Sequence, residues 1–286
     1  LAASPALLGY DLRNEPYVHE VSRNKDYDGR TLARKYPYTA AGMSGLANSM
    51  LRPDSYGSAT FYGCDRVVPR PEDAVQAQAY DAVNGIFGDW IGWYRSAFAR
   101  LGDRHPLTVG FNLWYAALPV GGKVDFLNQH TYVMPTDFEA VHNEITTMDR
   151  LHAMYPDKPV TLGEFGYTSG YVLQGRPLSV QSQAIGEMIH LLYAWTRNYG
   201  GVFDWQVYDF DPVNYRRIAV WNRDRYRFKQ DYERLHGIYA WDGTPYGMLK
   251  PYGMCMRFFS DAVAEGMDRG ELEYYKAPTQ IGTGFT

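Results

Sequence analysis

Two glutamates stand at the ends of apolar segments, where a carboxylate can act as an acid, a base or a nucleophile. Glu15 lies in Asn14-Glu15-Pro16 after the apolar run Ala6–Leu12, and Glu164 ends the run that begins at Val160. A carboxyl group at the end of a buried strand must be paired or functional, because an unpaired buried charge is costly. Two carboxyl groups that flank a glycosidic bond at roughly 5 Å cleave it with retention of configuration. For Glu15 taken alone, a solvated loop position is the alternative.

The elements that must position these residues follow from the hydrophobic pattern. Five apolar segments predict strands at residues 6–12, 105–112, 124–132, 160–165 and 202–208. Helical spacing predicts helices at residues 71–101, 137–155, 179–199 and 250–263, the third ending at Gly200-Gly201. Residues 17–70 show no clear periodicity, and a segment that long is either functional or partly disordered. Strands that alternate with helices are typical of a parallel α/β sheet.

Among α/β folds, the sequence favours a (β/α)8 TIM barrel over a Rossmann-like sheet. No G-x-G-x-x-G follows a predicted strand, and no P-loop is present. Polar residues instead collect at the carboxyl ends of several strands, where barrel enzymes keep their catalytic groups. We therefore expect a partial catalytic barrel over residues 1–268, followed over residues 269–286 by a tail or the start of a small β element.

The composition is that of a folded globular protein. Of the 286 residues 45% are hydrophobic and 21% are charged, and the formal net charge is −4. This charge offers no general attraction for nucleic acid or anionic lipid, and no apolar run reaches the ~18 residues of a membrane-spanning helix. The aromatic content of 16% suits a large core or platforms for sugar rings. Cys64 and Cys255 are too few for a disulfide scaffold or a four-cysteine zinc site, and we expect free thiols.

Other residues that suggest a site are weaker candidates. His105, His130, His142 and His152 do not follow a metal-ligand spacing, and His142 and His152 are expected on a helix surface. Residues 215–234 combine basic and aromatic side chains, which suits either nucleic acid or a solvated loop beside a sugar-binding cleft. We favour the loop because the chain as a whole is acidic.

Several segments, in order, resemble the second half of a clan A glycoside hydrolase, the group that contains family 5 cellulases and mannanases. LLGYDLRNEP (7–16) resembles the fourth strand of that barrel, and PVTLGEFGYTSG (159–170) resembles the seventh. The sixth and eighth strand ends are similar to QHTY (129–132) and FDWQVYDF (203–210), and the approach to the last helix is similar to GIYAWDGTPYGMLKPYG (237–253). The resemblance covers residues 5–265.

The resemblance implies a retaining glycoside hydrolase that acts on β-linked oligo- or polysaccharides without a metal or organic cofactor. Glu15 would be the general acid/base and Glu164 the nucleophile. Tyr132 would orient Glu164, with His130 as a further neighbour. Glu15 must then hold a proton near neutral pH, which calls for a desolvated site or the nearby charge of Glu164.

Three other residues would contact the sugar. Asn14 would hydrogen-bond the sugar 2-hydroxyl, an interaction that strengthens in the transition state. Trp205 would stack beneath the sugar at the cleavage point. Trp114, just past the second predicted strand, is either another sugar platform or part of the core.

The sequence departs from this family pattern at its start. The first three strands are missing, and the arginine that the second strand normally places near the nucleophile cannot be identified. We therefore expect an N-terminal polypeptide segment to complete the barrel. A non-catalytic carbohydrate-binding protein is the alternative function, and a metal-dependent hydrolase is disfavoured by the histidine spacing. No signal peptide is visible, although the resemblance favours a secreted or periplasmic protein.

Overall fold

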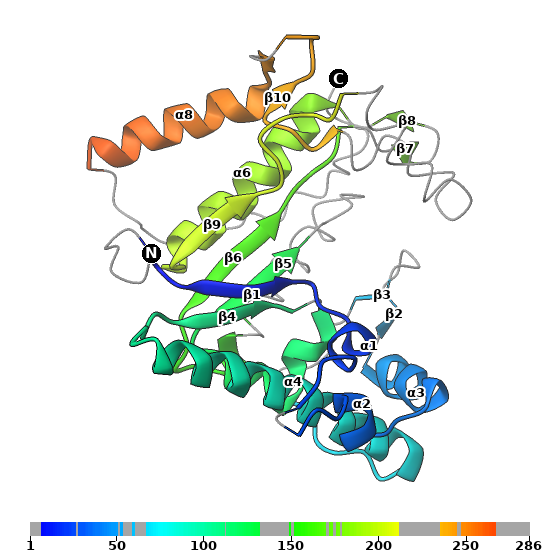
Figure 1. Cartoon of the computed structure of the whole chain (residues 1–286). Coiled ribbons are helices and arrows are strands. Elements are labelled where there is room, and N and C mark those ends of the chain that lie inside the picture. Colours follow the sequence, from blue (N-terminus) through cyan, green and yellow to red (C-terminus); the bar gives the residue numbers. More distant parts are fainter. Residues whose placement is uncertain are drawn as a thin grey trace. The chain divides into compact units, whose positions relative to one another are not determined.

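The structure is a computed structural model that describes most of the chain (Figure 1). The described residues are 7–26, 28–50, 52–53, 59–60, 67–111, 113–131, 149, 152–169, 172–173, 176–177, 179–211, 235–244 and 247–266. The chain divides into two compact units, Leu1–His130 with Thr146–Thr161 and Thr131–Ile145 with Leu162–Thr286. The predicted tail at residues 269–286 lies outside the described residues.

The first unit is organised around a parallel strand pair covered by a long helix. β1 (Tyr10–Asn14) pairs in parallel with β4 (Leu107–Gly110), and α4 (Ala74–Arg100) runs beside them (Figure 1). The other elements of this part are α1 (Val18–Val21), α2 (Leu32–Lys35), α3 (Ala40–Met50), β2 (Arg52–Pro53), β3 (Ala59–Thr60), η1 (Leu113–Ala117), η2 (Pro119–Lys123) and β5 (Leu127–Thr131).

The helix α4 forms where the spacing predicts it, and its ends have clear causes. Asp73 is the N-cap, its carboxylate accepting hydrogen bonds from the backbone N–H groups of Val75 and Gln76. The buried face of the helix packs Phe87 against the rings of Phe111 and Tyr115. Burial of these aromatic rings holds α4 against the strands, since each removes a large apolar area from water.

Residues 17–70, in which the sequence shows no clear periodicity, contain regular structure. They fold into α1, α2, α3 and the antiparallel pair β2–β3. Periodicity is weak because α3 is built from small residues, and its glycines permit close packing on α4. A Cβ added at Gly42 would lie 2.6 Å from the carbonyl oxygen of Val75. Packing against α4 therefore stabilises a helix that the hydrophobic pattern does not predict.

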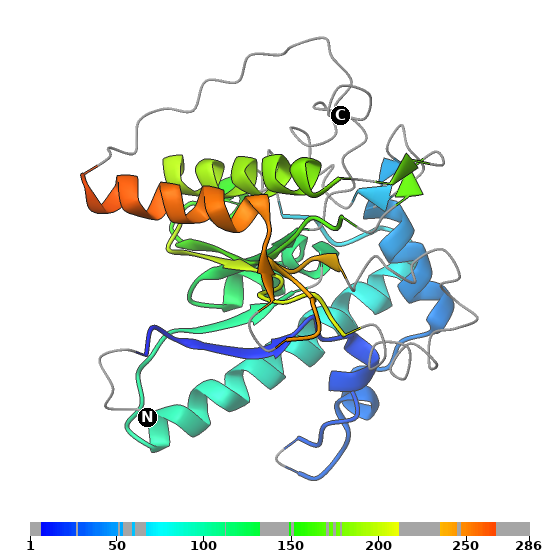
Figure 2. The ribbon, with the colours of Figure 1, turned by 90° about the horizontal axis from the view of Figure 1, so that it is seen from above.

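The second unit contains an α/β arrangement with two packed helices. Its elements are β7 (Val172–Leu173), β8 (Arg176–Pro177), α6 (Val180–Thr196), β9 (Gly201–Asp204), β10 (Tyr239–Ala240), β11 (Met248–Leu249) and α8 (Pro251–Ala264). Figure 2 shows α6 and α8 side by side, where Trp195 meets Phe259 edge to face. β6 (Val160–Phe165), most of which belongs to this unit, is the neighbour of β9 in the sheet.

The structure has a strand at each of the five predicted segments, but only β6 keeps its predicted bounds, and β9 ends at Asp204 rather than Tyr208. β1 begins at Tyr10 rather than Ala6, and Leu8 is 77% exposed. α6 ends at Thr196 rather than Tyr199, because Asn198 adopts a positive φ of 56° and closes a Schellman motif before Gly200 is reached. The predicted helix at 137–155 lies almost wholly outside the described residues. A complete eight-stranded barrel is not seen in the described ranges, where the fold is mixed α/β.

Within these ranges, no helix has both the length and the apolar character needed to cross a membrane.

A network of buried polar groups joins the elements of the second unit. Lys250 is 4% exposed, and its ammonium donates to Asp209 at 2.7 Å and to the side-chain oxygen of Gln183 at 3.3 Å. Glu187 is fully buried on α6 and accepts hydrogen bonds from the Tyr167 backbone and from Gln183. Partners of this kind offset the cost of burying charge.

Two carboxyl groups in this region have raised pKa values. Burial raises the pKa of Asp204 to about 7, against the opposing effects of the Tyr252 hydroxyl and the Lys250 ammonium. Burial, together with the charge of Asp204, raises the pKa of Glu187 well above its usual range. The folded chain therefore binds more protons than the unfolded chain between the ordinary carboxyl pKa of about 4 and these raised values.

We predict that the free energy of unfolding falls as the pH rises through this window. Urea unfolding at pH 5 and pH 8 should show a loss on the order of 2 kcal/mol in the unmodified chain, because both carboxyls must ionise in a buried site. Asp204→Asn should show a smaller loss, whereas Asp73→Asn, at an exposed cap, should behave like the unmodified chain. Equal losses in all three proteins would contradict the prediction.

Candidate active site

Glu15 follows the carboxyl end of β1 in a conformation that a glutamate rarely adopts. Its φ angle is +41°, in the left-handed region that favours glycine. Its backbone N–H donates to the carbonyl oxygen of Gly110 at 2.8 Å, so the turn is fixed against the neighbouring strand end. A non-glycine residue keeps such a strained conformation only where contacts with the surrounding structure hold it there. Residues of this kind cluster at functional sites.

His130, at the end of β5, contacts this glutamate. Its Nδ1 lies 3.1 Å from Oε1 of Glu15. The His130 side chain is 3% exposed and that of Glu15 is 32% exposed, so the imidazole is enclosed while the carboxyl group reaches solvent. The distance is within hydrogen-bond reach, so the buried ring can orient this strand-end carboxyl group. The sequence names His130 as a site residue but does not predict its contact with Glu15.

Asn14 is the last residue of β1 and is exposed. Its place immediately before Glu15 agrees with the strand-end position that the sequence predicts. Trp114 lies within η1, and its side chain lies outside what the structure describes, as does the whole of Tyr132. The roles predicted for Trp114 and Tyr132 therefore stay predictions.

In the second unit, Glu164 is the fifth of the six residues of β6. Side chains along a strand alternate between its faces, so Glu164 shares a face with Leu162. The opposite face carries Phe165, which stacks on His190 of α6 with ring centroids 5.7 Å apart. Glu164 is half-buried. It therefore lies on the strand face turned away from the covering helix, near the carboxyl end.

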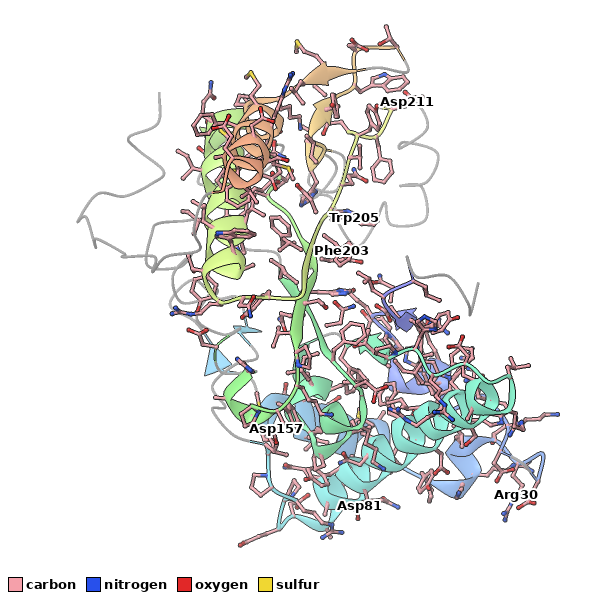
Figure 3. The ribbon with its side chains drawn as sticks, turned by 90° about the vertical axis from the view of Figure 1, so that its left-hand side faces the viewer. Arg30, Asp81, Asp157, Phe203, Trp205 and Asp211 are labelled. Atoms are coloured by element: carbon pink, nitrogen blue, oxygen red, sulfur yellow. The ribbon has the colours of Figure 1, made fainter. Side chains whose placement is uncertain are left out.

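Trp205 follows β9 directly, at the neighbouring strand end. Its backbone N–H donates to the carbonyl oxygen of Phe165 at 2.8 Å, which places it beside the end of β6 in the same unit. Its side chain is 36% exposed, and Phe203, two residues earlier, is 55% exposed (Figure 3). Large aromatic faces in contact with water suit stacking on sugar rings.

The structure describes some of the weaker candidate residues but not others. His152 is exposed, as expected of a helix surface, and Cys255 is an exposed free thiol. Cys64, His142 and residues 215–234 lie outside the described residues. The nitrogen Nδ1 of His105 contacts the carboxylate of Asp103 at 2.7 Å.

Three residues around Glu15 were missed from the sequence. Asp11, Gly110 and Asn128 come from three different strands and are linked by hydrogen bonds through the Asp11 carboxylate. Gly110 carries the one usable signal, because a glycine at the end of a strand marks the close approach of another group. Asp11 gives no such signal, since a polar residue in a strand is usually solvated.

Comparison with known proteins gives partial structural similarities. No protein-family model matches the chain, and no curated protein does so either. A β-D-glucuronidase from Dictyoglomus thermophilum has a TM-score of 0.41 and 14% identity, with 68% of this chain and 30% of that protein covered. A GH2 β-galacturonidase from Eisenbergiella tayi has a TM-score of 0.42 and 14% identity, with 68% and 32% covered.

A third similar structure belongs to another family. The glycoside hydrolase family 17 β-1,3-glucanosyltransferase from Rhizomucor miehei has a TM-score of 0.42 and 18% identity, with 58% of this chain and 55% of that protein covered. The chain thus spans about a third of the first two proteins and about half of the third. Two of these three proteins belong to glycoside hydrolase families 2 and 17, whereas the sequence motifs resemble family 5. At these TM-scores and identities the similarity assigns neither family nor activity.

The left-handed backbone at Glu15 gives a prediction about stability. Glu15→Gly should be more stable than Glu15→Ala by about 1 kcal/mol, because glycine adopts a positive φ without the steric cost that a Cβ brings. Urea denaturation of the two variants measures the difference. At an ordinary position glycine is the less stable of the two, so a more stable Glu15→Ala would refute the strained conformation.

Proposed function

We propose that the chain is a retaining glycoside hydrolase of the clan A type that cleaves β-linked glycans or glycosides. The observation that carries the proposal is the strand-end Asn14-Glu15 turn, whose glutamate has a left-handed backbone and contacts the buried His130. Glu164, near the carboxyl end of another parallel strand, supports it. In barrel enzymes the carboxyl ends of the strands carry the catalytic groups.

In the proposed reaction, Glu164 is the nucleophile and Glu15 is the acid and then the base. The Glu164 carboxylate attacks the anomeric carbon while Glu15 gives its proton to the departing glycosidic oxygen, so a glycosyl ester forms as the C–O bond breaks. Water then attacks the anomeric carbon, its proton passes to Glu15, and Glu164 is released as a carboxylate. The two steps restore both residues and retain the configuration.

Four other residues are proposed to bind the substrate or to orient the nucleophile. Asn14 would donate to the sugar 2-hydroxyl, and the exposed face of Trp205 would stack beneath the sugar ring. Tyr132 is proposed to orient Glu164, and Trp114 is proposed as a further sugar platform. Neither chemical step calls for a metal, so treatment with EDTA should leave turnover unchanged.

The exposed aromatic residues of the second unit support a second candidate function, which is carbohydrate binding without cleavage. Trp205, Tyr208 and Trp241 are 36%, 43% and 41% exposed, and Tyr208 stacks on Tyr239. Such surfaces also occur in proteins that bind carbohydrate without cleaving it. Binding that is lost in Trp205→Ala, together with the absence of turnover, would favour this alternative.

We predict different substrate dependence for the two glutamate variants. Glu164→Gln should remove nearly all turnover of every substrate, because no glycosyl ester can form. Glu15→Gln should lose on the order of 100-fold or more on natural glycans but far less on aryl glycosides with activated leaving groups, which need little protonation. Steady-state rates on matched substrates measure this. Equal losses of Glu15→Gln on both substrate types would contradict its role as the acid.

We also predict a trapped intermediate. After incubation with a panel of 2-fluoro aryl β-glycosides, denaturing mass spectrometry of the intact chain should show one glycosyl adduct, and peptide mapping should place it on Glu164. The sugar that labels the chain identifies the substrate class. The control is Glu164→Gln, which should remain unlabelled. An adduct on another residue, or equal labelling of this variant, would refute the nucleophile assignment.

A further inference from the structure

The turn that carries Glu15 begins at an irregularity in β1. The register pairs Asp11 with Thr108 and Asn14 with Gly110, so β1 has one residue more than β4 between these pairs. An extra residue in one strand leaves backbone groups outside the regular ladder and redirects the side chains that follow. The consequence here is a changed direction for Asn14 and Glu15.

The Asp11 carboxylate stabilises this irregularity. Its Oδ1 accepts hydrogen bonds from the backbone N–H groups of Arg13 and Gly110, each at 3.1 Å. Its Oδ2 accepts from the side-chain amide of Asn128 on β5 at 2.7 Å. One side chain thus joins β1, β4 and β5 just before the residues that form the candidate site. Hydrogen bonds to an ionised carboxylate are among the stronger ones in proteins.

Because Gly110 has no side chain, the His130 ring can occupy the space beside its Cα atom. A Cβ at Gly110 would lie 2.7 Å from Nε2 and 2.9 Å from Cε1 of His130, closer than real Cβ contacts allow. The same Cβ would lie 3.1 Å from Oδ2 of Asp11. His130 is buried, so its ring has little room to retreat. Any side chain at this position must move the imidazole that contacts Glu15.

We propose that Asp11 and Gly110 are positioning residues for Glu15. Asp11 holds the irregular strand end that sets the Glu15 backbone, and Gly110 lets His130 reach the Glu15 carboxyl group. This inference rests on the proposed function, in which Glu15 is the acid/base. Neither residue touches the substrate in this scheme, and both act through the geometry of Glu15 and His130.

The kinetic test compares Gly110→Ala and Asp11→Asn with Gly92→Ala, a control in which the added Cβ meets nothing within 4 Å. The two positioning variants should lose about 10-fold to 100-fold in kcat/KM on glycosides with poor leaving groups, and much less on activated aryl glycosides, because acid catalysis is what they impair. Gly92→Ala should match the unmodified chain on both. Equal losses on both substrate types would indicate general damage and overturn the proposal.

A measurement without substrate separates this inference from the proposed function. The ring ¹H–¹³C NMR resonance of His130 should move in Glu15→Gln, in Gly110→Ala and in Asp11→Asn, but not in Gly92→Ala. Because the residues act through one contact, the effects of Glu15→Gln and Gly110→Ala should not add. If the chain cleaves no glycoside, the proposed function fails while these resonances still decide the positioning roles. An unmoved resonance in Asp11→Asn and Gly110→Ala, or strictly additive shifts, would overturn them.

Discussion

The hydrogen bond from the Glu15 backbone to Gly110 is the constraint on which the candidate site of the first unit depends. It ties the residue after β1 to the end of β4 at 2.8 Å. This bond and the hydrogen bonds of Asp11 fix the backbone on both sides of Glu15, which has a positive φ. The cost of this conformation is offset by hydrogen bonds that span three strands, so the carboxyl group is held in place rather than free to sample loop conformations.

A different constraint governs the second unit, where several charged groups are buried. Lys250 stands just before α8 and reaches Asp209, Gln183 and the backbone of Leu235, so one ammonium connects segments far apart in sequence. Burial raises the pKa values of Glu187 and Asp204, against the opposing effect of the Lys250 charge. Buried networks of this kind specify one arrangement of elements while making its stability dependent on pH.

Both units follow one arrangement, in which parallel strands end at the polar residues of interest. The helices cover one side of the strands, as α4 does with Phe87 and as α6 does with His190. The strand ends reach solvent, with Glu15 and Glu164 half-buried and Trp205 exposed. A rigid scaffold with reactive groups at its strand ends is what the proposed two-carboxylate chemistry requires.

The sequence by itself determined the five strands, the helices α4, α6 and α8, and the positions of both glutamates at strand ends. These features depend on local periodicity, capping and proline or glycine punctuation, which act within a few residues. Only the tertiary structure decided that α3 is a helix, that His130 contacts Glu15, and that Gly110 and Asp11 support that contact. Each of these depends on a contact between residues that are far apart in the sequence. Local hydrophobic patterns do not indicate which distant residues come into contact.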